Sequence, residues 1–284
     1  MNIIKMSLMT LYAELEKIIR QQIWDSYPSD WREDYITRKI LFEYRKLFRN
    51  IQIQGLSSLD FTINSVAYKF TGNLETQFGD IGFLVRIKYP DNSIIEGVTS
   101  LEAKIKHKKT RRFQEIKGRQ LQTISANIKY PMLLMYDYQP IEKVHDYSFF
   151  PSTTKQNYAA VVPINVVYSI IRDVKPDFHN QDKNNKTPVD AKTIYKFSVP
   201  LAYQIIFRYF RGLDLDFDHD LVKYIKGYEF EEGNYRRVIE ERSLPQYLLC
   251  ISVDYGELES YIDMDFGVNI NFFSEITSSE PEDF

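Results

Sequence analysis

The chain is poor in cysteine and glycine, and it has no long apolar run. Its 284 residues include one cysteine, Cys250, which excludes an internal disulfide framework. Because the segment around Cys250 is apolar, we expect a buried structural thiol rather than a reactive one. No apolar stretch reaches the roughly 20 residues of a membrane-spanning helix, and the first residues lack the apolar core of a signal peptide. We therefore expect a cytoplasmic protein that does not contact membranes.

Several ligand-binding motifs are also missing. There is no glycine-rich phosphate loop, so the sequence does not encode an ATP-driven motor. The 4 histidines have no cysteine or histidine partner at ligand spacing, which leaves zinc unsupported. The alternating aspartates of 214–220 resemble a calcium loop, but they lack its turn glycine and its final glutamate.

Basic residues are absent after Arg242, although the net charge of the whole chain is only −3. The acidic residues of this last segment are Asp254, Glu257, Glu259, Asp263, Asp265, Glu275, Glu280, Glu282 and Asp283. The chain up to Arg242 is therefore net positive. We expect the acidic segment to offer a docking surface to a basic partner protein, and 276–284 to be a disordered acidic tail.

Apolar periodicity predicts helices alternating with strands. The predicted helices are 10–25, about 30–49, 111–126, 164–172 and 198–212, and the predicted strands are 51–54, 60–70, two strands of a hairpin within 81–105, 131–137, 159–163 and 248–253. Asp30 and Glu33 fit a capping box for the second helix, and Ser198 fits an N-cap for the last. This order predicts a mixed α/β fold, in which helices flank a mixed central sheet.

A polar stretch at 175–188, with proline near both ends, indicates a boundary. It separates an expected core with N-terminal helices, 1–175, from an appended α+β element, 190–275.

Three charged residues in the hairpin form the most informative pattern. Asp80 precedes the first strand, and Glu102 and Lys104 lie on one face of the second, because strand side chains alternate. An acid and a base on a mostly buried strand are costly unless something pairs with them. A divalent metal held by Asp80 and Glu102, with Lys104 beside it, would remove that cost.

An Asp at the start of one strand followed by Glu-x-Lys on the next resembles the PD-(D/E)XK nuclease superfamily, which has the restriction-endonuclease-like fold. Gly79 replaces the proline of that pattern. Gln120, on the next predicted helix, matches a glutamine found in several branches of the superfamily. The resemblance covers roughly residues 35–170.

The resemblance implies a metal-dependent DNA endonuclease. Asp80, Glu102 and the backbone carbonyl of Ala103 would hold Mg²⁺, with Mn²⁺ as a plausible substitute. Lys104 would orient water, neutralise developing charge or, if a neighbouring dication pushed it toward neutrality, act as a base, and Gln120 would steady the water or the phosphate. A further acid is expected from the helix before the sheet, where Glu43 lies on the apolar face, or from Glu75 ahead of Asp80.

The basic residues concentrate beside this motif. Those expected to contact DNA phosphates are Lys106, Lys108, Lys109, Arg111, Arg112, Lys117 and Arg119. Phosphate contacts position a protein on DNA without reading its sequence, and charge runs of this kind are otherwise solvated surface.

The sequence alone leaves three functions open. The first is an effector nuclease of a prokaryotic antiviral or restriction-type defence system, licensed by a partner such as a helicase or another ATPase. The second is a recombination endonuclease, such as a resolvase or a transposase subunit. The third is a non-catalytic module that binds nucleic acid or a partner. The oligomeric state is not predicted.

Overall fold

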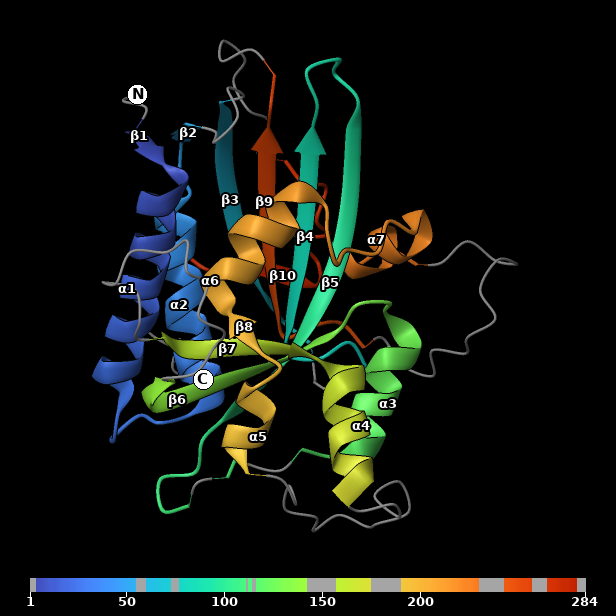
Figure 1. The fold of residues 1–284 in the computed structure, drawn as a ribbon. Helices are drawn as coiled ribbons and strands as arrows, with labels where there is room; N and C mark the ends of the chain where they lie inside the picture. The colour runs from blue at the N-terminus through green and yellow to red at the C-terminus, as the bar shows by residue number, and fades with distance from the viewer. Residues whose placement is uncertain are drawn as a thin grey trace.

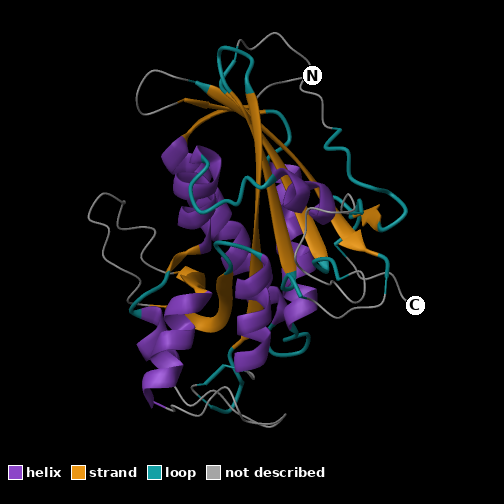
Figure 2. Ribbon diagram, turned by 90° about the vertical axis from the view of Figure 1, so that its right-hand side faces the viewer, coloured by secondary structure: helices purple, strands orange, loops and turns teal. Residues whose placement is uncertain are grey.

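The fold is seen in a computed structural model that describes residues 4–54, 60–72, 77–110, 112–113, 116–141, 157–174, 190–229, 243–256 and 265–279. Within these residues ten strands form one mixed sheet in the order β1-β2-β3-β9-β4-β5-β6-β7-β8, and β10 pairs with β3. The strands are β1 (Ile4–Ser7), β2 (Ile51–Gln54), β3 (Phe61–Phe70), β4 (Ile81–Lys88), β5 (Ile94–Ile105), β6 (Met132–Ile141), β7 (Asn157–Pro163), β8 (Val199–Pro200), β9 (Tyr247–Asp254) and β10 (Phe273–Glu275). The expected mixed sheet between helices is confirmed (Figures 1 and 2).

Helices cover both faces of the sheet. The α-helices are α1 (Leu8–Ser26), α2 (Glu33–Leu47), α3 (Gly118–Asn127), α4 (Ile164–Val174), α5 (Ala191–Tyr195), α6 (Leu201–Tyr203) and α7 (His219–Ile225), and α6 continues into a π-helical segment (Gln204–Arg208) and a 3₁₀ helix (Tyr209–Arg211). α1, α2 and α6 pack in one hydrophobic core, and α3, α4, α5 and α7 pack in a second core on the other face. Figure 1 shows α1 and α2 on the opposite side from α3, α4 and α7. No described helix is both long and apolar enough to cross a bilayer.

A strand from the acidic last segment of the chain, β9, lies at the centre of the sheet. β9 pairs antiparallel with β3 and parallel with β4 along its whole length. Every residue of β9 is buried, including Cys250, and burial raises the pKa of that thiol. The domain boundaries stay a prediction. However, 190–275 supplies a central strand of the sheet and is not simply appended to it.

Three predicted helix starts are wrong. α2 is capped by Arg32 without a side-chain hydrogen bond, so Asp30 forms no capping box there. The helix expected from residue 111 begins at Gly118, because Phe113 instead forms a β-bridge with Lys106. Ser198 donates its hydroxyl to the carbonyl of Tyr195, and the helical stretch begins after Pro200.

The described part of the expected tail, 276–279, packs against the fold. Ile276 is only 2% exposed, its N–H donates to the carbonyl of Ala67, and its own carbonyl accepts from Arg45. Ile276 is therefore packed into the fold, Thr277 and Ser278 are exposed, and 280–284 lie outside the described residues. Periodicity does not predict this packing, because Ile276 is a lone apolar residue in a polar segment.

Ile276→Ala should lower the free energy of unfolding by about 2–5 kcal/mol, since it leaves a cavity in the core. Ile270→Ala is the matched control, because Ile270 is 81% exposed in the same segment and should change stability by at most about 0.5 kcal/mol. Urea denaturation measures both. Equal effects would contradict the docking of residue 276.

An acidic side chain is buried between α1 and α6. Glu16 of α1 lies in the core beside α6, and burial raises its pKa from 4.5 to about 8. The backbone of Ala202 and the charge of Arg20 offset that only in part. Glu16 is therefore mostly protonated at neutral pH in the folded protein.

Because the folded-state pKa of Glu16 lies above the unfolded value, the wild type should lose stability as the pH rises from about 4.5 to about 8. Glu16→Gln is neutral at every pH, so its melting temperature should match the wild type near pH 4 and exceed it near pH 8. Glu14→Gln, on the exposed face of α1, should show no such pH-dependent gain. A gain for Glu16→Gln that does not depend on pH would refute the buried-acid assignment.

Candidate active site

The candidate site lies where β5 runs past the start of β4. The ladder between the two strands starts with Ile81 opposite Leu101, whereas β5 continues along β6 as far as Ile105. Beyond Leu101, β5 has no ladder with β4, and a side chain pairs with its backbone instead. The N–H of Ala103 donates to Oδ2 of Asp80 at 2.8 Å. The hairpin and the proximity of Asp80 to this segment are confirmed.

Gly79 sets the position of Asp80. It has φ +79, which proline cannot adopt, and a Cβ there would lie 2.8 Å from the carbonyl oxygen of Leu101. Next to it, the N–H of Asp80 donates to that same carbonyl, and the carbonyl of Asp80 accepts from Tyr247. The glycine that replaces the proline of the superfamily pattern is therefore required by the local backbone.

An acid from the start of α2 completes the cluster. The indole N–H of Trp31 donates to the carbonyl of Lys106 at 2.8 Å, which fixes the beginning of α2 against the end of β5. Glu33, in the first turn of α2, then lies 3.7 Å from Nζ of Lys104. The helix N-terminus favours a carboxylate at this position.

Lys104 is the common partner of the acids. Its ammonium donates to Glu102 and, at 2.6 Å, to the carbonyl of Ala103. Oδ2 of Asp80 lies 4.0 Å from the same nitrogen. Three carboxylates and one carbonyl therefore surround a single buried positive charge.

The single positive charge of Lys104 cannot neutralise all three carboxylates. Burial and the neighbouring charge of Asp80 together raise the pKa of Glu33 to about 8 and that of Glu102 to about 7, against the opposing effect of Lys104. Burial would lower the pKa of Lys104, but the surrounding carboxylates outweigh it and raise the pKa. Lys104 is thus an ammonium in this arrangement, and not a neutral base.

The donor atoms of this cluster are of the types that bind a divalent cation. Oε2 of Glu102 is buried without a hydrogen-bond partner, which is costly unless a cation or proton satisfies it. Carboxylate and carbonyl oxygens are the ligands that Mg²⁺ and Mn²⁺ prefer. Within the described residues, however, no three acid, histidine or cysteine side chains are arranged to hold a metal ion, and the Lys104 ammonium lies close to all three acids.

The other predicted site residues lie elsewhere or are not described. Glu43 pairs with Lys46 at 2.9 Å on the outer part of α2, and it lies ten residues, or about 15 Å along the helix axis, from Glu33. The structure therefore places Glu33, and not Glu43, beside Lys104. Glu75 lies outside the described residues. Gln120 is in the first turn of α3, and no hydrogen bond in the described part of the chain joins it to the acids.

The expected phosphate-binding residues divide into two groups. Lys106 is buried and donates to both carboxylate oxygens of Asp137, so we assign it to the fold. The exposed members are Lys108, Lys109, Arg112, Lys117 and Arg119. Arg111 lies outside the described residues. In the acidic segment, Asp254 is also buried, paired with Lys88, and so offers no docking surface.

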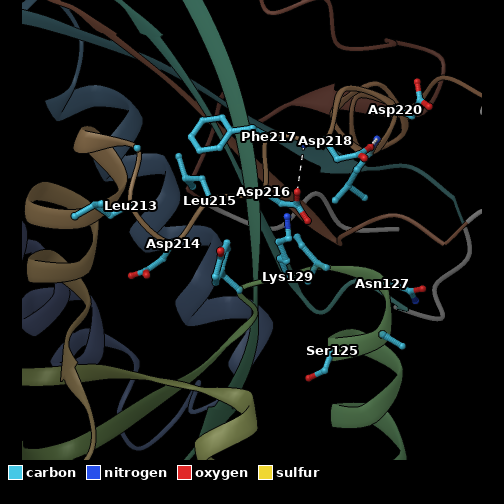
Figure 3. Close-up of a pocket in the computed structure, with 15 residues that line it drawn as sticks. Ser125, Asn127, Lys129, Leu213, Asp214, Leu215, Asp216, Phe217, Asp218 and Asp220 are labelled. Carbon is cyan, nitrogen blue, oxygen red and sulfur yellow. Dashed lines mark hydrogen bonds between the residues drawn. The ribbon is translucent and has the colours of Figure 1, made fainter.

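A concavity of about 1150 Å³ lies between the end of α3 and the segment before α7 (Figure 3). Its aspartates serve local structure: Asp214 pairs with Arg208, Asp216 accepts from the N–H of Asp218, and Asp218 caps α7. Figure 3 shows Asp214 pointing away from the other aspartates. None of the residues that line this concavity belongs to the candidate site.

Comparison with known proteins gives no relative. No family model matches the chain, and neither a curated protein nor a solved structure does. The assignment of the candidate site therefore depends on the geometry of its own residues.

Gly79→Ala should destabilise the protein more than Gly267→Ala. Both glycines have a positive φ, but a Cβ at position 267 meets no atom within 4 Å, whereas at position 79 it collides with the backbone of Leu101. Gly267→Ala measures only the cost of placing a Cβ at a positive φ, roughly 1–2 kcal/mol. Gly79→Ala should lose that amount and, in addition, the cost of the collision with Leu101. Thermal denaturation of both variants measures the difference. Equal losses would show that β5 can move away from Gly79.

Proposed function

We propose that this protein is a metal-dependent phosphodiesterase of the PD-(D/E)XK type that cuts DNA, with Mg²⁺ as its ion and Mn²⁺ as a substitute. The observation that carries the proposal is the convergence of Glu33, Asp80 and Glu102 around Lys104, beyond the end of a β-ladder. The role as effector of a prokaryotic defence system, with a helicase or ATPase partner, is proposed on the resemblance alone.

The electrostatics of the cluster support a role in binding a cation. Two of the three acids have raised pKa values, so each holds a proton part of the time near neutral pH. A structural ion pair would be more stable with fewer acids. An excess of carboxylates around one ammonium is instead typical of a site that gains its full charge balance only with a cation.

The residues of the chain would divide the work as follows. Asp80, Glu102 and the carbonyl of Ala103 would hold the ion, and Glu33 would hold it directly or through water. When bound, the ion supplies a water of lowered pKa and neutralises charge on the phosphate. Lys104 is an ammonium, so its role is to stabilise negative charge on the phosphate and to position the attacking water.

Cleavage of plasmid DNA with Mg²⁺ tests this proposal. Asp80→Ala, Glu102→Gln, Lys104→Ala and Glu33→Gln should each reduce the rate by at least about 100-fold, the scale of losing one group that stabilises a transition state. Glu43→Gln is the matched control on the same helix, and it should cleave like the wild type.

Each variant needs a melting curve, because a folded and inactive protein is the informative result. Full cleavage by Glu102→Gln would overturn the site. Full cleavage by Glu33→Gln, with the other three inactive, would remove only Glu33 from it.

A non-catalytic binding module is the second candidate. The observation in its favour is that the Lys104 ammonium itself pairs with Glu102 and lies 3.7 Å from Glu33, and so supplies positive charge to these acids. Such a module would bind DNA or a partner, but it would show neither cleavage nor a rise in melting temperature with Mg²⁺ or Mn²⁺. A recombination endonuclease would share the centre and differ in the DNA that it cuts.

A further inference from the structure

Aromatic side chains gather in two groups at the end of α1, one of Tyr27, Trp31 and Tyr138 and one of Trp24 and Tyr158. Tyr27 stacks on Tyr138 of β6, with ring centroids 4.5 Å apart and planes at 15°. Trp31 packs edge-on against both rings, at 5.6 Å and 5.7 Å. Trp24, one helical turn before Tyr27, packs edge-on against Tyr158 of β7 at 5.8 Å. We call Trp24, Tyr27, Trp31 and Tyr138 the aromatic platform.

Two of these rings are turned to solvent. Trp24 is 51% exposed and Tyr27 is 37% exposed, whereas Trp31 is buried and holds the start of α2 in place. A lone exposed aromatic residue needs no explanation, but two on one helix face, backed by further rings, form an apolar surface that water solvates poorly. The fold requires Trp31, and it does not require the exposed faces of the other two.

The charge around the platform is mainly positive. Arg20 lies over the ring of Trp24 at 5.4 Å, and the exposed Lys108 donates to the carbonyl of Pro28 beside Tyr27. Lys109 is exposed next to Lys108. The acids on the same segment are Asp25, which accepts from Gln21, and the partly buried Asp30. Rings interleaved with cations are the combination that binds unpaired nucleotides, by base stacking and by phosphate contact.

The platform is continuous with the candidate site. Trp31 lies two residues before Glu33, and its indole bonds to the carbonyl of Lys106, two residues after Lys104. Lys106 in turn lies over the ring of Tyr138 at 5.2 Å. A DNA strand that leaves the acids along β5 would therefore reach Tyr27 and Trp24 next.

We propose that the aromatic platform binds unpaired nucleotides, so that the substrate of the site is DNA with a single-stranded segment beside the cut. The proposal rests on the proposed function, and it names the substrate class. Bases within a duplex are stacked on each other and cannot stack on side chains. The platform is thus selective for single-stranded DNA, whereas the charged residues also attract duplex DNA.

Binding without divalent metal tests this, because cleavage cannot then interfere. The probes are a fluorescein-labelled 12-nucleotide oligothymidylate and a labelled 12-base-pair duplex, followed by anisotropy. Trp24→Ala and Tyr27→Ala should each weaken oligothymidylate binding by about 5- to 100-fold, the scale of one lost base stack, and should change duplex binding by less than about 2-fold. Tyr27→Phe keeps the ring and should bind like the wild type.

Tyr89→Ala is the matched control for a lost surface ring. Tyr89 is also 37% exposed and also stacked, on Tyr255 at 6.4 Å, but it lies at the hairpin turn. It should leave both affinities unchanged. Melting curves confirm that each variant is folded. The chain has only 2 tryptophans, so oligothymidylate should also quench the fluorescence of the exposed Trp24.

The outcomes separate the two proposals. If the wild type cleaves DNA but folded Trp24→Ala and Tyr27→Ala bind oligothymidylate like the wild type, the platform is refuted and the nuclease remains. A parallel loss of single-strand and duplex binding also refutes stacking. If the wild type cleaves no DNA but shows the expected loss of single-strand binding in the variants, the platform holds and the nuclease fails.

Discussion

The candidate site depends on one buried positive charge, the ammonium of Lys104. It pairs with Glu102 and lies within 4.0 Å of carboxylate oxygens of Glu33 and Asp80. Without it, three acids would face each other in a largely buried space, which is strongly destabilising. The start of α2, the turn before β4 and the free edge of β5 are all arranged around this charge.

Local sequence predicted the parts of the site that belong to the hairpin. Alternation along the strand puts Glu102 and Lys104 on one face, and the turn brings Asp80 back to them. Glu33 could not be found in this way, because its position depends on the docking of Trp31 against Lys106, a contact between distant segments. In the sequence, Glu33 fits a capping box with Asp30, so the local pattern favoured a structural role for Glu33 over a place in the site.

Pairing between segments far apart in the sequence also explains the other differences between the predictions and the structure. The pattern of residues 248–253 predicted a strand, but only its partners β3 and β4 place it at the centre of the sheet. Lys106 belonged to a basic run in the sequence, and the parallel pairing of β5 with β6 brings it to the buried Asp137. Strand existence and local register follow from periodicity, whereas sheet order and ion-pair partners do not.

The central claim is that the acids around Lys104 form a cation site. Titration calorimetry with Mn²⁺ at pH 7, in two buffers of different ionisation enthalpy, tests it most directly. Glu33 and Glu102 carry protons part of the time, with pKa values of about 8 and 7, and a bound dication would displace them. The account predicts saturable binding with proton release, both lost in Glu102→Gln and retained in Glu43→Gln. Binding that is absent in the wild type, or unchanged in Glu102→Gln, would contradict it.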